Sequence, residues 1–67
     1  MLNKIEVKVE VEMEKAGFEN VTSIVCNIEA TAENCIAFYG VYKTSNGRGT
    51  FTGLYNIVEN NIYNLTV

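Results

Sequence analysis

The sequence contains no histidine, aspartate, tryptophan or proline, and it has only two cysteines. Neither Ser23 nor Ser45 can pair with an imidazole base, so a serine nucleophile of the triad type is excluded. A zinc site needs more cysteine or histidine than this, and a calcium loop needs clustered aspartate. With a three-residue turn between their strands, Cys26 and Cys35 point to opposite faces and stay free. We therefore expect a protein that is not an enzyme and that has no cofactor and no metal.

Long apolar runs and positive charge are also scarce. No stretch approaches the roughly 20 residues that span a bilayer, and the N-terminal residues lack the apolar segment of a secretory signal. Five Lys and Arg stand against eight acidic residues, which gives a net charge of −3. We expect a cytoplasmic protein that contacts no membrane and does not bind nucleic acid directly.

The chain is short, and its 67 residues predict a single domain over residues 1–67. A domain of this size buries only about 60% of the surface of its unfolded chain, so it is marginally stable unless it is oligomeric. Its hydrophobic content is 48%, with many aromatic and β-branched residues. This composition favours a folded chain over a disordered one.

The strongest local signal is Asn46-Gly47, which lies between two runs rich in aromatic and β-branched residues. Both central residues of a type I′ turn need a positive φ angle, and Asn-Gly is a preferred pair there. We expect one hairpin over Cys35–Val58 with Asn46-Gly47 at its tip. In this register the pairs are Ser45 with Arg48, Tyr42 with Phe51, Gly40 with Gly53, Phe38 with Tyr55, and Ile36 with Ile57.

Residues 4–14 alternate apolar with charged side chains, and this alternation predicts a half-buried strand. A helix is the alternative, because Ile5, Val9 and Met13 fall on one helical stripe and Gly17 is placed to end a helix. The helix would leave two valines on its outer side. It would also set three glutamates at the repulsive i, i+4 spacing, so we favour the strand.

Alternation also predicts strands over residues 21–31 and 62–67, with turns near residues 31–34 and 59–61. Together these elements predict an all-β fold, a five-stranded antiparallel meander or a small open barrel. The alternative is an α+β fold in which an N-terminal helix packs on a four-stranded antiparallel sheet. The register of the last strand stays open, and a shift of one residue would exchange its faces.

Both faces of the predicted hairpin are apolar, whereas an antiparallel sheet with one wet face alternates apolar and polar residues. We therefore expect a second copy of the chain, or another protein, to cover one face. The leading hypothesis is a small non-catalytic domain that binds proteins or itself through an aromatic hairpin face. Its predicted site residues are Phe38, Gly40, Tyr42, Arg48, Phe51, Gly53 and Tyr55.

The glycines and the arginine of this site have simpler explanations as well. Two opposed glycines would leave a slot for a ligand or a partner's side chain. Alternatively, neighbouring rings fold over the glycines, or the glycines let the sheet bend. Arg48 would contact an anion or an acidic partner, or serve only as a solvated residue of the hairpin tip.

Two other functions remain open. An acidic surface on the first strand would block a nucleic-acid-handling enzyme, in the manner of a small phage-type anti-defence inhibitor. Alternatively, these charges only protect an edge strand against aggregation. The third function is a sponge that holds a small nucleotide-like ligand between subunits, by stacked tyrosines and Arg48. The acidic surface consists of Glu6, Glu10, Glu12 and Glu14.

Overall fold

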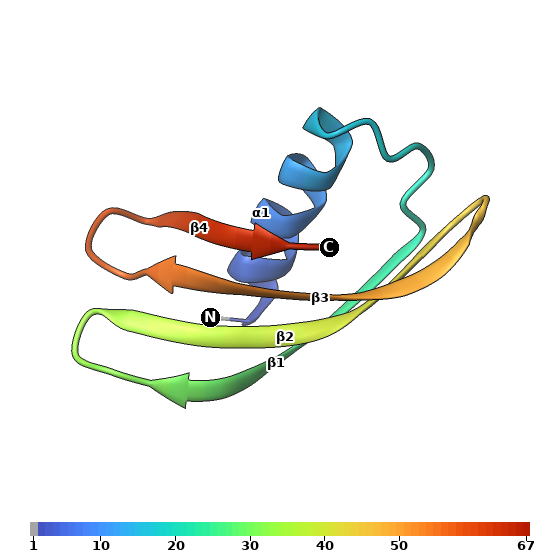
Figure 1. Cartoon of the computed structure of the whole chain (residues 1–67). Coiled ribbons are helices and arrows are strands. Elements are labelled where there is room, and N and C mark those ends of the chain that lie inside the picture. The colour runs from blue at the N-terminus through green and yellow to red at the C-terminus, as the bar shows by residue number, and fades with distance from the viewer. Residues whose placement is uncertain (1) are drawn as a thin grey trace.

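The computed structural model describes residues 2–67, which form one helix followed by four strands (Figure 1). All strand pairs are antiparallel, and the sheet has the order β1-β2-β3-β4. The fold is therefore the α+β alternative, and the five-stranded all-β prediction is wrong. The elements are α1 (Leu2–Lys15), β1 (Ser23–Thr31), β2 (Cys35–Thr44), β3 (Gly47–Asn56) and β4 (Asn61–Thr66).

The helix α1 takes the place of the strand predicted over residues 4–14. Its apolar stripe of Ile5, Val9 and Met13 is completely buried against the sheet. On its outer side, Val7 and Val11 stay 64% and 44% exposed. A strand here would have left the aromatic side of the sheet without cover. Burial of that side outweighs the β preference of valine, because tertiary packing decides most helices in proteins.

The end of α1 follows the pattern that the helical alternative requires. Gly17 has a φ angle of +99°, in the left-handed region that favours glycine. The Phe18 N–H donates to the Met13 carbonyl and the Gly17 N–H to the Glu14 carbonyl, both at 3.1 Å. These two bonds are the Schellman motif. They direct the Phe18 ring toward the sheet, where it meets Tyr42 edge-on at a centroid distance of 5.6 Å.

The β2–β3 hairpin is confirmed as the centre of the sheet, but its partners differ from the predicted ones by two residues. Ser45 and Asn46 form the tip, and Thr44 pairs with Gly47. The Thr44 hydroxyl stabilises this tighter tip, since it accepts from the Asn46 N–H and donates to the Gly47 carbonyl, both at 3.2 Å. A shift of two residues keeps each side chain on its predicted face. The predicted faces therefore hold, and the predicted partners do not.

The sheet curls around α1, and both edge strands approach the helix (Figure 1). A bulge in each edge strand accompanies this curvature. Glu29 of β1 has no partner on β2, and β4 accommodates an extra residue near Asn64, whose φ angle is +55°. Bulges bend a strand and increase its twist. The inner face of the sheet packs on α1 and contributes the buried residues Cys26, Ile36, Phe38, Phe51 and Tyr55.

Candidate binding surface

The aromatic residues that the sequence singles out lie mostly beneath α1. Phe38, Phe51 and Tyr55 are only 1–2% exposed, and the two phenylalanine rings meet edge-on at 6.1 Å. Because these side chains are apolar, they pack on the chain's own helix and on one another. The prediction of a binding face at these three residues is corrected accordingly, since they offer no surface to a partner.

Gly40 and Gly53 do not face each other, so the predicted slot does not form. Gly40 lies opposite Phe51, and Gly53 lies opposite Phe38. A Cβ atom added at Gly40 would lie 2.6 Å from the Phe51 ring and 2.1 Å from the Val25 carbonyl oxygen. At Gly53 it would lie 2.7 Å from the Phe38 ring. The rings fold over the glycines, which is the simpler of the two explanations.

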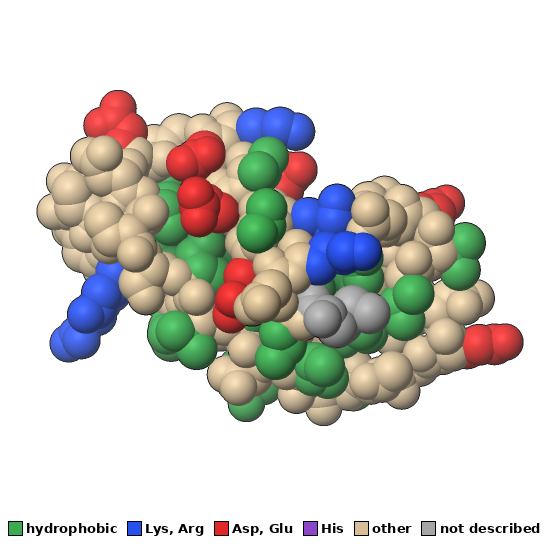
Figure 2. Space-filling model, turned by 180° about the vertical axis from the view of Figure 1, so that it is seen from behind, with side chains coloured by type: hydrophobic (Ala, Val, Ile, Leu, Met, Phe, Trp, Pro, Cys, Tyr) green, Lys and Arg blue, Asp and Glu red, His purple; other side chains and the backbone are tan. Residues whose placement is uncertain are grey.

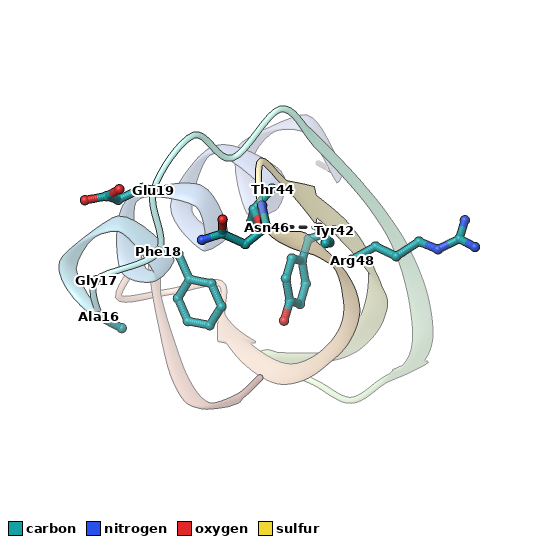
Figure 3. Close-up of a pocket in the computed structure, with 9 residues that line it drawn as sticks. Ala16, Gly17, Phe18, Glu19, Tyr42, Thr44, Asn46 and Arg48 are labelled. Carbon is teal, nitrogen blue, oxygen red and sulfur yellow. Dashed lines mark hydrogen bonds between the residues drawn. The ribbon is translucent and has the colours of Figure 1, made fainter.

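The other two predicted site residues, Tyr42 and Arg48, lie near the hairpin tip (Figure 3). A hollow of about 390 Å³ separates the tip from the end of α1. Tyr42 and Phe18 stand side by side in it, while Arg48 points away on one side and Glu19 on the other (Figure 3). Ligand sites rely on polar groups that converge. The divergent charges give this hollow no such set for a nucleotide-like ligand.

The predicted acidic surface lies on α1 instead of on a strand. Glu10 and Glu14 are exposed, and Glu12 forms an ion pair with a lysine at 3.7 Å. Glu6 is half-buried, and its carboxylate accepts the backbone N–H of Cys26 at 2.9 Å. It thereby covers a free N–H on the edge of β1. Acidic, hydrophobic and basic side chains lie close together on this side of the molecule (Figure 2), so the negative charge is interrupted.

The two cysteines are free and lie on opposite faces, as the sequence predicts. Burial, and then the charge of Glu6, raise the pKa of the Cys26 thiol to about 11, so this thiol stays protonated at neutral pH. Cys35 lies on the other face, with its sulfur 3.2 Å from the Tyr63 hydroxyl. That hydrogen bond is the main cause that raises the pKa of the Tyr63 phenol.

The surface that stays open is the outer face of the sheet, turned away from α1. Three of its side chains, Val25, Tyr39 and Val41, remain 50%, 45% and 51% exposed. The strand register makes the surface continuous across all four strands. We define the outer face by Val25, Asn27, Ala37, Tyr39, Val41, Thr50, Thr52, Leu54, Tyr63 and Thr66.

None of these outer-face residues belongs to the site predicted from the sequence. The hairpin pattern does contain a signal for this surface, because it predicts two apolar faces. Tyr39 and Val41 belong to the face with fewer aromatic residues. The sequence analysis places the site on the more aromatic face, and this is the face that α1 covers.

The outer face is hollowed near the hairpin tip. The hollow has a volume of about 560 Å³, and its floor is formed by Val25, Val41 and Thr50. Lys43 and Arg48, which pair directly across β2 and β3, lie at its rim. The site is an apolar depression with two cations at one end.

The two ends of the sheet carry opposite charge. The hairpin tip end has Lys43 and Arg48, while the turns between β1 and β2 and between β3 and β4 hold Glu33 and Glu59. Both turns lie together at the end opposite the hairpin tip (Figure 1). Glu59 lies in the turn that leads into β4, and its charge is the last of the causes that raise the pKa of Tyr63.

Comparison of the chain with family models, with curated proteins and with solved structures found no match in any of the three. Within residues 2–67, no helix is long and apolar enough to cross a membrane. The same residues contain no group of three Cys, Asp, Glu or His side chains placed to hold a metal ion.

Proposed function

We propose that this chain is a non-catalytic binding domain that associates with a second copy of itself through the outer face. The observation that carries the proposal is the exposure of about half of Val25, Tyr39 and Val41 on one continuous surface. Burial of apolar surface contributes about 25 cal/mol per Å². No segment within residues 2–67 covers this face, so a second molecule is needed to bury it.

A second copy suits the face because its two ends have opposite charge. Lys43 and Arg48 at one end match Glu33 and Glu59 at the other, so the surface is complementary to itself. Sheets commonly pack face to face about 10 Å apart. The assembly would have four layers, with helices outside and two sheets between them.

The edges of the sheet are less suited to association than its face. On β1, the Cys26 N–H already bonds to Glu6, and Glu29 disrupts the strand. On β4, the irregularity near Asn64 interrupts the regular pairing. Bulges and covered N–H groups protect edge strands from adding further strands.

The valines of the chain provide both the probe and the control for this proposal. In a dilution series followed by methyl NMR, the signals of Val25 and Val41 should shift with concentration. Val7 and Val11, exposed on the helix, should not shift. Shifts confined to Val7 and Val11 would place the contact on the helix. Constant signals at all four residues, in a chain whose mass in solution is that of one copy, would contradict self-association.

The acidic inhibitor and the ligand sponge remain predictions from the sequence, and neither gains a specific observation. Salt separates the inhibitor from the proposed function. An acidic surface loses affinity for a basic partner steeply as salt increases, whereas an apolar contact persists.

A further inference from the structure

We infer that the two copies pack with their strands reversed, around a two-fold axis that crosses the strands near Tyr39 and Thr52. In this arrangement the hairpin tip of one copy lies over the turn end of the other. The inference rests on the proposed self-association and adds the orientation, which decides which residues meet.

When the strands of two facing sheets are roughly aligned, as they are in most sandwiches, a two-fold axis between the sheets runs either along the strands or across them. An axis parallel to the strands would bring Lys43 and Arg48 against the same residues of the second copy. An axis across the strands reverses the ends, so these cations approach Glu33 and Glu59 of the second copy. The first arrangement places like charges together, and they repel. The reversed arrangement places opposite charges together at both ends, and their attraction favours it.

The strand register identifies the side chains that would meet. Tyr39 and Thr52 form the middle row of the outer face, so each lies close to the axis. Reversal places the neighbouring row over its counterpart on the other side, with Val41 against Ala37. The rows, taken from the tip, are Lys43–Arg48, Val41–Thr50, Tyr39–Thr52, Ala37–Leu54 and Cys35–Asn56.

Side-chain size agrees with this pairing. The larger Val41 meets the smaller Ala37, and the smaller Thr50 meets the larger Leu54. The hollow of about 560 Å³ beside Val41 and Thr50 is then the space that Leu54 of the second copy enters. The cores of subunit interfaces are packed as densely as protein interiors, and these two pairs of unequal size are compatible with that density.

Crosslinking of single cysteines tests the orientation separately from the association. The background is Cys35→Ser, and the buried Cys26 stays protected. Tyr39→Cys should crosslink two copies through a short thiol-to-thiol reagent in either orientation, so it reports face contact. Val41→Cys should crosslink poorly with itself and well with Ala37→Cys in a mixture.

The outcomes separate the two claims. Efficient self-crosslinking of Val41→Cys, without a mixed product with Ala37→Cys, would overturn the reversed orientation and leave self-association intact. Absence of any Tyr39→Cys product, together with a monomeric mass of the unmodified chain, would overturn both.

Charge reversal gives a second test in which no cysteine is needed. A variant with Lys43→Glu and Arg48→Glu, and another with Glu33→Lys and Glu59→Lys, should each self-associate about ten-fold more weakly. An equal mixture of the two variants should restore the affinity. Unchanged self-association of each variant would overturn the role of these charges in setting the orientation.

Discussion

At the scale of single residues, each glycine in the middle of β2 and β3 lies opposite an aromatic residue of the other strand. Each ring covers the backbone of the glycine opposite, a known way to support glycine in a sheet. The pairs are Gly40 with Phe51, Gly49 with Tyr42, and Gly53 with Phe38. The sequence contains every member of these pairs, but a register error of two residues turns them into a slot that does not exist. Turn chemistry alone does not fix the register, because the Thr44 hydroxyl selects a different tip.

Gly40→Ala should be the most damaging of the glycine substitutions. Its new Cβ would lie 2.1 Å from the Val25 carbonyl oxygen, which can move only if β1 separates from β2. We expect a loss of roughly 3 kcal/mol in the free energy of unfolding, measured by urea denaturation. Gly49→Ala is the control, because it meets only the end of the Tyr42 side chain at 2.6 Å, and should cost roughly 1 kcal/mol. Equal losses would contradict the close approach of β1 at Gly40.

The buried thiol of Cys26 should make stability depend on alkaline pH. Its pKa rises from 9.0 to about 11 on folding, because burial and the charge of Glu6 disfavour the thiolate. Above the unfolded value the unfolded chain loses a proton that the folded chain keeps, so the free energy of unfolding falls as pH rises. The contribution is fully present below pH 9.0 and is lost by about pH 11. Denaturation curves at several pH values should show a shallower decline for Cys26→Ala, and parallel declines would refute the assignment.

At the scale of elements, local signals predict the sheet well and the helix poorly. The extents of β1 and β4 and the position of the central hairpin follow from alternation and turn residues, which act within a few positions. The first element is different, because Ile5, Val9 and Met13 belong to both an alternating pattern and a helical stripe. Only the need to cover the inner face of the sheet separates the two. That need depends on strands distant in the sequence.

Alanine at the exposed valines of α1 tests helix against strand directly. Val7→Ala and Val11→Ala should each stabilise the fold by about 0.5 kcal/mol, because alanine favours helices and little burial is lost. Val9→Ala is the matched control at a fully buried position and should cost roughly 2 kcal/mol. Thermal unfolding measures all three. Destabilisation by Val7→Ala and Val11→Ala would instead fit a strand, where valine is preferred.

At the scale of the whole molecule, the sheet has two faces with apolar residues, and the single helix covers only one of them. The chain extends over 37 × 19 × 18 Å, and α1 packs on the inner face alone. The sequence predicts two apolar faces, and the proposal of a partner for one of them starts from that prediction. The sequence does not indicate which face remains open, because this depends on the side of the sheet on which α1 packs.

Because the chain is small, the proposed association would also contribute to its stability. Within residues 2–67, eight hydrophobic side chains are buried, a small core for an independent domain. Binding that occurs only in the folded state stabilises that state in proportion to the logarithm of concentration. Contact through the outer face would therefore support the fold as well as provide its function.

Molar mass in solution, from light scattering coupled to size exclusion, distinguishes a self-associating chain from a monomer. We predict about 15 kDa, twice the 7.5 kDa of one chain, at both low and high salt. Val41→Glu should reduce the mass toward that of one chain, while Val7→Glu, which adds the same charge on the helix, should leave it unchanged. A folded chain that stays at 7.5 kDa at every concentration would show that the outer face does not mediate self-association.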